Sequence, residues 1–420
     1  MSNYANRNLR WLLSSSTVSN LADGIAKVAF PLLAASITHD PVLIAALSAT
    51  QFLPWLLFGV LAGGLVDRVD RRKAMIVANL GRAAAIGVLA ALVSFGTVSI
   101  VVIYAAALLV GTAETVADST ANVLIPAVVG HDRLERANSK LQATEIVGQT
   151  FLGGPVGSLT FAMFAAFPFL LDTAAFAIAA ALLVPLAGSY RARAADAPAQ
   201  RPTQHPERKR LRTELAEGLN WLRRSRLIAR MVVIASLVSL TSELAQAQLV
   251  LYALDDLGLS KAAFGVFAFV GGIGGLIGAG LAARLIAALH RLPVLLAGIV
   301  LAGVGFGCMG LSSNVVVSAA LFGLFAAALV LVNVVLATVR HAEVPGELLG
   351  RVLGVWRTAV WGAIPVGAIL GGVLTDVLDN PSATFRVSGV LLVAVAGLSA
   401  VLLWRHRHAI NATSQSRQAQ

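Results

Sequence analysis

Acidic and basic side chains stand inside long apolar stretches of this sequence, and the first two of them could carry proton chemistry. Asp23 and Lys27 lie one helical turn apart in "NLADGIAKVAF", so a helix would place both side chains on one face. A carboxyl group in apolar surroundings can take up and release a proton, and a neighbouring amine controls when it does so. A structural interpretation is also open, in which the two charges neutralise each other and only allow the helix to insert into an apolar phase.

Further polar residues occur at similar depth in other apolar stretches, where a buried charge is costly and therefore indicates function. Glu114 and Asp118 share one helical face, and their repulsion leaves one of them protonated unless a cation such as Arg82 or Arg71 intervenes. Asp172 lies nearer the end of its stretch and is predicted to be interfacial. The candidates for a proton or substrate pathway are Asp23, Lys27, Glu114, Glu145, Glu243, Asn333 and Arg357.

Other kinds of chemistry lack the residues that they need. Cys308 is the single cysteine, and the seven histidines form no cluster with metal-ligand spacing. The sequence shows no nucleophile–base pair and no glycine-rich phosphate loop followed by Lys and Ser or Thr. "GGIGGLIGAG" at 271–280 places small residues at helical spacing, which favours close helix packing. The sequence therefore predicts no metal, no cofactor and no enzymatic activity.

The densest group of charges lies in "GGLVDRVDRRKAM", residues 63–75, where six charged side chains fill seven positions. Exposed ion pairs are worth only about 0–1 kcal/mol each, so they form and break readily. Such a group suits a reversible latch between parts of the molecule that separate. A simpler interpretation is that its basic residues only hold this loop on one side of a membrane.

The elements that position these residues are predicted to be membrane-spanning helices. The chain is 57% hydrophobic and 13% charged, which is more apolar surface than a soluble domain of 420 residues can bury. A span needs roughly 20 mostly apolar residues, because lipid offers the backbone no hydrogen-bond partners. Twelve stretches meet this requirement: 11–34, 42–66, 74–95, 99–120, 137–158, 162–187, 227–253, 263–287, 292–311, 314–340, 350–376 and 383–404.

The distribution of lysine and arginine predicts the orientation of these spans. The loops after the second, fourth and sixth spans are rich in basic residues, whereas the alternate loops contain only Lys261 and Arg386. Both termini and the long middle run are therefore predicted to be cytoplasmic. The net charge of +11 follows from this topology, which makes binding of nucleic acid an unnecessary explanation.

Two groups of six spans on either side of a polar run indicate an internal duplication. The run ends in "LRTELAEGLNWLRRSRL", which has the pattern of an amphipathic helix at a membrane surface. The predicted parts are an N-terminal six-helix half (1–187), a cytoplasmic linker with this helix (188–226), a C-terminal six-helix half (227–405) and a cytoplasmic tail (406–420).

The stretch "GGLVDRVDRRK" resembles the signature between the second and third helices of the major facilitator superfamily. Six residues match it, and Asp70 stands where that signature has Gly. "DRVDRR", "ANVLIPAVVGHDRLERANS" and "VPGELLGRVLGV" are similar to the branch of enterobactin and macrolide exporters. The matching residues are Gly63, Leu65, Asp67, Arg68, Arg71 and Arg72.

The resemblance implies an all-α fold of twelve helices in two pseudo-repeated halves, with a latch between them. It places Asp67 against the helix that begins near 349–354 and pairs Arg71 with Asp118. The latch set is Gly63, Asp67, Arg68, Arg71, Arg72 and Asp118.

The stretch "GQTFLGGPVG" is similar to the helix-5 signature of antiporters in the superfamily. Gly154 and Pro155 match its centre and Gly157 flanks it, but Ser158 and Leu159 replace the expected glycine pair. Glycine and proline loosen a helix and let a neighbour approach, as a rocking interface requires. An ordinary helix kink is the alternative interpretation.

The predicted function is secondary transport by alternating access in the cell membrane, with a small molecule and the proton as partners. The resemblance favours export of an amphipathic organic compound, such as a drug, antibiotic or siderophore-like natural product, by proton antiport. Proton-coupled import of a small solute and transport of a lipid or lysolipid are the alternatives. The protein is predicted to act as a monomer.

Overall fold

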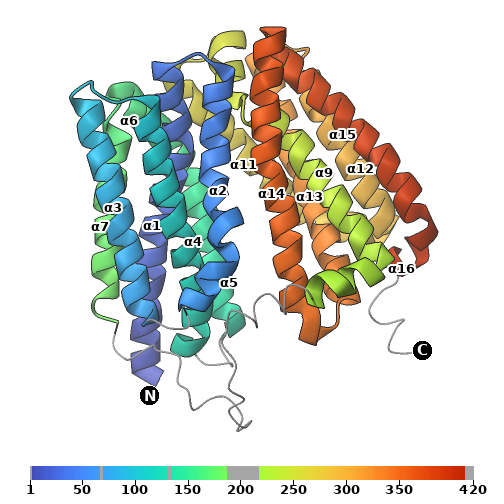
Figure 1. Ribbon diagram of the computed structural model, residues 1–420, viewed down its shortest axis with the longest axis horizontal. Helices are drawn as coiled ribbons and strands as arrows, with labels where there is room; N and C mark the ends of the chain where they lie inside the picture. The colour runs from blue at the N-terminus through green and yellow to red at the C-terminus, as the bar shows by residue number, and fades with distance from the viewer. Residues whose placement is uncertain (1, 67–69, 130–133, 187–216, 412–420) are drawn as a thin grey trace. The chain divides into compact units, whose positions relative to one another are not determined.

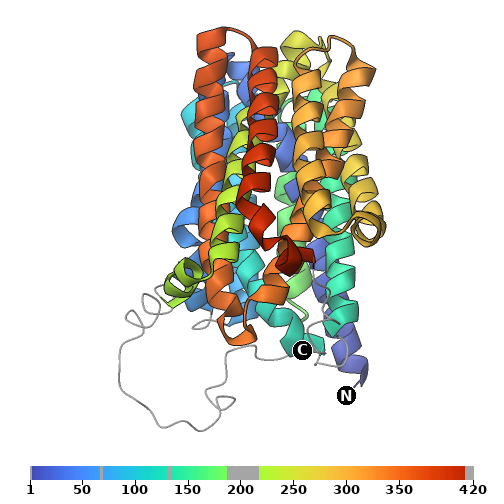
Figure 2. The ribbon, with the colours of Figure 1, turned by 90° about the vertical axis from the view of Figure 1, so that its right-hand side faces the viewer.

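The computed structural model describes residues 2–66, 70–129, 134–186 and 217–411, and within these ranges every regular element is helical (Figures 1 and 2). The first half of the chain contains α1 (Ser2–Ile37), α2 (Pro41–Val66), α3 (Arg71–Ser94), α4 (Ile100–Val129), α5 (Leu134–Glu145), the π-helix η2 (Ile146–Leu152), α6 (Gly153–Met163) and α7 (Phe167–Leu183). The second contains α9 (Arg226–Gln246), α10 (Leu249–Leu251), the π-helix η3 (Tyr252–Asp256), α11 (Lys261–Leu289), α12 (Arg291–Met309), α13 (Val315–Glu343), α14 (Gly346–Leu378), α15 (Pro381–Leu403), η4 (Trp404–His406) and α16 (Arg407–Asn411).

The helices have the length and composition that a bilayer demands. Within the described ranges, nine helices are long and apolar enough to cross a membrane, and two shorter apolar ones cover Pro41–Leu56 and Phe167–Leu183. Helices satisfy their own backbone hydrogen bonds, so they suit a solvent that offers none. The protein is therefore an all-helical, multi-pass membrane protein, while the count of twelve spans stays a prediction.

Two compact units divide the chain: residues 1–200 with 258–269, and residues 201–257 with 270–420. In the first unit, α7 packs against α1 and α3, and α4 packs against α2 and α3. In the second unit, α12 packs against α13 and α15, and α9 packs against α14 and α15. In each unit, side chains are therefore positioned by contacts between helices of that same unit.

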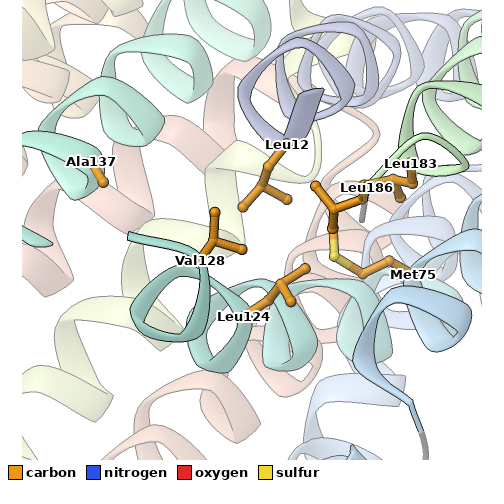
Figure 3. Close-up of a cluster of buried hydrophobic side chains, with 7 residues drawn as sticks. All are labelled: Leu12, Met75, Leu124, Val128, Ala137, Leu183 and Leu186. Atoms are coloured by element: carbon orange, nitrogen blue, oxygen red, sulfur yellow. The ribbon is translucent and has the colours of Figure 1, made fainter. Parts of the chain in front are cut away.

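Within the first unit, a cluster of buried aliphatic side chains draws together parts of α1, α3, α4, α5 and α7 (Figure 3). Its members are Leu12, Met75, Leu124, Val128, Ala137, Leu183 and Leu186. Because lipid is as apolar as these side chains, close packing rather than exclusion of water holds such helices together. The cluster holds the end of α7 next to the start of α3, which contains Arg71, Arg72 and Lys73 of the charged stretch.

Two of the charges in that stretch have a local structural role. Asp70 is the N-cap of α3, and its Oδ1 accepts a hydrogen bond of 3.2 Å from the backbone N–H of Lys73. Arg72 donates to the carbonyl of Val184 at the C-terminal end of α7, where a cation is favourable. The cap explains why Asp stands here in place of the Gly of the superfamily signature.

We expect Asp70→Ala to lower the free energy of unfolding by about 1 kcal/mol, because it leaves an N-terminal N–H of α3 without its acceptor. Asp70→Asn keeps a side-chain oxygen and should retain most of the stability. Thermal unfolding of the purified protein measures both. Equal losses in the two variants would show that the charge, and not the cap, is what matters.

Several helices in the structure extend beyond the predicted boundaries of their spans. The first predicted span, 11–34, lies within the longer α1, and α4 continues through the apolar run "ANVLIPAVV" to Val129. The predicted tail begins with the short helix α16, which turns away from α15 in Figure 2. Asn411 accepts a hydrogen bond of 3.0 Å from the backbone N–H of Leu292, so this helix is tied to α12.

The predicted amphipathic helix is described only from residue 217, and residues 217–224 are helical. Leu222 is buried, and Glu217 forms an ion pair with Arg351 of α14. A side chain at Gly218 would collide with the backbone of Arg351. This end of the linker therefore packs directly on α14. The rest of the linker, 188–216, lies outside the described residues.

Candidate functional site

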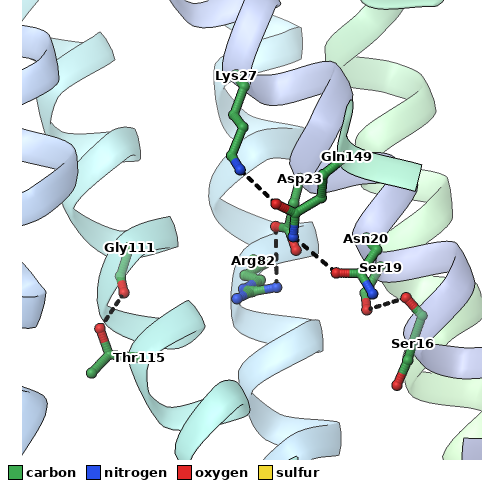
Figure 4. A network of polar contacts seen from close by, with 9 residues as sticks. All are labelled: Ser16, Ser19, Asn20, Asp23, Lys27, Arg82, Gly111, Thr115 and Gln149. Carbon is green, nitrogen blue, oxygen red and sulfur yellow. Dashed lines mark hydrogen bonds and ion pairs between the residues drawn. The ribbon is translucent and has the colours of Figure 1, made fainter. Parts of the chain in front are cut away.

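A network of polar side chains crosses the interior of the first unit between α1, α3 and η2 (Figure 4). The helix α1 contributes Asn20, Asp23 and Lys27, spaced so that all three lie along one side of the helix. Arg82 comes from α3 and Gln149 from η2. Polar groups in a membrane-spanning segment are rare and mark ion or substrate pathways.

The centre of this network is an ion pair between α1 and α3. Arg82 Nη1 lies 3.4 Å from Asp23 Oδ1, and the two side chains are only 2% and 11% exposed. The Arg82 guanidinium also lies over the ring of Phe176, at 5.0 Å from Cζ to the ring centroid. Arg82 Nε and Nη2 have no hydrogen-bond partner among the described residues. A buried pair of this kind is held by its two partners alone, so removal of either leaves an uncompensated charge.

Lys27 does not pair with Asp23, which corrects the interpretation that these two residues neutralise each other. Lys27 Nζ donates to Gln149 Oε1 at 2.5 Å, and Gln149 Nε2 donates to Asn20 Oδ1 at 2.9 Å (Figure 4). Asn20 Nδ2 in turn donates to Thr144 Oγ1 at 3.4 Å. The two cations near Asp23 thus connect α1 to two different neighbours.

Glycines let α1 approach η2 and α6 to backbone contact. A Cβ added at Gly24 would lie 2.7 Å from Gly148 O, and one at Gly157 would lie 2.8 Å from Ile25 O. A Cβ at Gly153 would collide with the backbone of Gly24. The π-helical turn of η2 lies beside this contact, and π-helical turns recur at functional sites. The helix-5 signature is therefore a site of close packing that carries Gln149 to the network.

The remaining residues of the signature face another neighbour. A Cβ added at Gly154 would find Gly265 O of α11 at 3.4 Å, an ordinary contact. Ser158, which replaces an expected glycine, is buried and donates to Ala262 O at 3.0 Å. Pro155 follows the π-helical turn of η2 within a continuous run of helical backbone over 134–163. The close helix contact in this signature is therefore made by Gly153 and Gly157, and Gly154 leaves room for a side chain.

Two further acids lie near the network without joining it. Glu114 of α4 is half-buried and Glu145 of α5 is exposed, and both lie within electrostatic range of Asp23. Sequence reasoning assigned Arg82 to Glu114 or Asp118, whereas in the structure Arg82 pairs with Asp23.

Asp172 lies near the start of α7 and is completely enclosed by the protein. It is 0% exposed because α7 packs against both α1 and α3, and its interfacial depth stays a prediction. Both of its carboxyl oxygens are buried without a hydrogen-bond partner among the described residues. It also lies within electrostatic range of Asp23, so it belongs to the same part of the first unit.

The predicted latch is described only in part. Asp67 and Arg68 lie outside the described residues, Gly63 lies within α2, and the structure places Asp118 in α4 without describing its side chain. Arg72 caps α7 as described above, and the predicted pair of Arg71 with Asp118 stays a prediction.

A separate cavity of about 320 Å³ lies in the second unit between α9, α13 and α14. Polar side chains line it on an otherwise aliphatic wall, namely Ser239, Ser242, Glu243, Asn333, Arg340 and Trp356. Arg340 stands over Trp356, with 4.7 Å between Cζ and the ring centroid. Such convergence of polar groups in a concave apolar surface is typical of ligand sites.

The predicted pathway residues of the second half are distributed unevenly around this cavity. Glu243 and Asn333 line it together, whereas Arg357 lies over Trp361 at 5.6 Å and is not part of the lining. Arg340 was missed as a member of the site, whereas Trp356 belonged to a larger set of aromatic residues that could face a cavity. Arg340 lies in the last turn of α13, where a basic residue is expected for orientation and for the helix end alone.

Comparison with known proteins places this arrangement in context. A family model described as transmembrane secretion effector matches residues 1–419. An uncharacterized MFS-type transporter of Bacillus subtilis, YfiS, is 25% identical over 402 residues, which cover 93% of this chain and 91% of that protein. An uncharacterized MFS-type transporter of Mycobacterium tuberculosis, Rv0037c, is 36% identical over 114 residues, or 27% of this chain. That match spans only 25% of the mycobacterial relative.

Among solved structures, a mutant of the nucleoside transporter NupG superposes with a TM-score of 0.78. The two chains are 12% identical, and the match covers 94% of this chain and 99% of that chain. The superposition establishes a shared fold. At this low identity it says nothing about the transported compound.

Proposed function

Since the chain belongs to the transmembrane secretion effector family of the major facilitator superfamily, we propose that it exports an amphipathic organic compound in exchange for protons. Membership makes it a multi-pass membrane transporter of a small molecule, and the matched family is not a catalytic one. The proposal concerns the direction of transport, the proton and the class of compound, such as a drug, an antibiotic or a siderophore-like product.

The observation that carries the proposal is the buried ion pair between Asp23 and Arg82. When Asp23 is ionised, the pair holds α1 against α3. When Asp23 takes a proton, the attraction is lost and Arg82 becomes an uncompensated buried cation, which is costly. The two protonation states thus favour different arrangements of the first unit, which is the free-energy difference that a two-state carrier needs.

In the proposed cycle, Asp23 binds a proton from outside and releases it to the cytoplasm, and the substrate moves in the opposite direction. Lys27, held by Gln149, and the acids Glu114 and Glu145 lie within electrostatic range of Asp23.

The rest of the proposal follows the superfamily resemblance. Twelve spans form two six-helix halves that alternate in access, and both termini lie in the cytoplasm. The charged stretch before α3 acts as the latch, and the monomer in the plasma membrane is the working unit. The division into two compact units supports two halves, although residues 258–269 group with the first unit.

A lipid or lysolipid is the second candidate substrate, and one observation favours it. A groove of about 920 Å³ runs along α3 and α4 and is lined almost entirely by small or aliphatic residues. Asp70 and Lys73 stand at one end of it, where a polar headgroup could lie. An acyl chain fits such a wall better than a polar solute does.

We expect cells that contain the protein to accumulate less of a fluorescent amphipathic dye than cells that lack it. Ethidium as a cation and 8-anilinonaphthalene-1-sulfonate as an anion cover the two charge types. The difference should disappear with a protonophore and in Asp23→Asn. Asp40→Asn makes the same change of charge at the exposed N-cap of α2 and should keep full export.

The decisive comparison uses equal amounts of folded protein in the membrane. Export at the wild-type rate in Asp23→Asn would rule out the proposed proton site. Higher accumulation of a dye in cells with the protein would reverse the direction and favour import. Movement of a fluorescent lysolipid, with neither dye affected, would favour the second candidate.

A further inference from the structure

The cavity of the second unit contains polar atoms that the protein itself does not satisfy. Nε of Arg340 and Oγ of Ser242 are buried and have no hydrogen-bond partner among the described residues. Both residues line the same cavity of about 320 Å³. Buried polar groups are almost always paired, so two unpaired groups at one concave site indicate a binding partner that is not part of the chain.

The geometry around Arg340 prepares it for an anion. Trp356 is only 7% exposed, and its ring supports the guanidinium face at 4.7 Å, which restricts the rotation of the arginine side chain. Arg357 lies within electrostatic range and adds positive potential. A planar guanidinium that is already oriented loses less entropy on binding a carboxylate, which it can engage with two parallel hydrogen bonds.

We propose that this cavity binds the anionic group of an aromatic amphipathic substrate, with Arg340 as the anchor and Trp356 beside the ring system. The inference rests on the proposed function only in taking the bound compound to be the transported one. Ser242 and Asn333 supply further hydrogen-bond donors. Glu243 lines the same cavity and, when ionised, repels the anionic group of the ligand, so the attraction of Arg340 has to outweigh this repulsion.

The size of the cavity limits what it holds. Ligand sites range over about 300–1,000 Å³, and this one lies at the lower end. It fits a carboxylate or sulfonate joined to one or two fused rings. The aliphatic wall of Val332, Leu336, Val360 and Ile364 suits the apolar edge of such a ring.

Equilibrium binding to the purified full-length protein tests this without any gradient. The probes are 1-naphthylacetate and its cationic counterpart 2-(1-naphthyl)ethylamine, which share the ring and differ in the sign of the charge. A ligand that binds the folded state raises the unfolding temperature, and the rise grows with the logarithm of the ligand concentration relative to its Kd. We expect the anion to stabilise the wild-type protein and the cation to have no effect.

The variants separate the anchor from its surroundings. Arg340→Gln should weaken binding of 1-naphthylacetate by about tenfold or more, because it removes a charge-assisted hydrogen bond. Arg340→Lys keeps the charge but lacks the planar guanidinium, so its affinity for 1-naphthylacetate should lie between those of the wild type and Arg340→Gln. Arg284→Gln removes a charge from an exposed position of α11 and should bind as the wild type does.

The unfolding temperature without ligand identifies any variant that fails to fold. If Arg340→Gln fails to fold, the binding of 1-naphthylacetate to Arg340→Lys is the test. Equal stabilisation by the anion and the cation would overturn the proposal, and so would unchanged binding in both Arg340 variants. Because binding is measured at equilibrium, either result would leave the proposal of proton-coupled export unaffected. A wild-type protein that binds 1-naphthylacetate but exports neither dye would instead contradict the proposed function.

Discussion

Arg82→Gln is expected to lower the free energy of unfolding by about 3–5 kcal/mol, the largest effect that the structure predicts for one side chain. The variant leaves Asp23 in a site where it is only 11% exposed and has lost its ion-pair partner. The guanidinium's contact with Phe176 is lost as well. Thermal and denaturant unfolding of the purified protein measure the change.

The double variant Asp23→Asn/Arg82→Gln removes both charges and serves as the control. It should regain most of the stability, because neither partner is left uncompensated. Export should nevertheless stay lost, since no proton-binding carboxyl is left in the pair. A double variant as unstable as Arg82→Gln would mean that packing, and not charge, accounts for the loss.

Gly153→Ala is the second change with a large expected effect. The added Cβ would collide with the backbone of Gly24, so α1 and α6 must separate. Overpacking of this kind costs about 1–3 kcal/mol. The separation also stretches the hydrogen bond between Lys27 and Gln149, so export should fall more than the amount of folded protein does.

The neighbouring Gly154→Ala is the matched control. Its Cβ would find its nearest atom, Gly265 O, at 3.4 Å, so no backbone has to move. Alanine is a better helix former than glycine by about 1 kcal/mol, but its Cβ is unfavourable before Pro155 in a helix, so this variant should be about as stable as the wild type. Equal damage from both substitutions would show that flexibility of the motif, and not the α1–α6 contact, is what the sequence requires.

The sequence predicted the class of fold well because each long apolar stretch is a local signal. Which residue a charged side chain pairs with is not a local property, because it depends on how the helices pack. The one-turn spacing of Asp23 and Lys27 favoured a pair within α1, whereas the partner of Asp23 is Arg82, which is distant in sequence and comes close only because α1 and α3 both pack against α7. The burial of Asp172 is likewise not visible in the sequence, since it depends on which helices cover the side chain.

The site residues likewise divide into those that local sequence indicates and those that depend on how the helices pack. Glu243 and Asn333 could be proposed from polar character in apolar surroundings, and they do line a cavity. Arg340 lies at the end of α13, where topology alone explains a basic residue, so its place in the same cavity was hidden. Asp70 departs from the superfamily signature, and only the start of α3 shows that it is an N-cap.

Proton movement in proteoliposomes tests the central claim, exchange of substrate for protons, most directly. Vesicles containing the purified protein, a pH indicator and an exported dye are diluted into dye-free buffer, and the internal pH is followed. Antiport predicts that the interior becomes acidic as the dye leaves, in the wild type and not in Asp23→Asn, whichever way the protein is inserted. An interior that becomes alkaline, or dye efflux without any pH change, would contradict it.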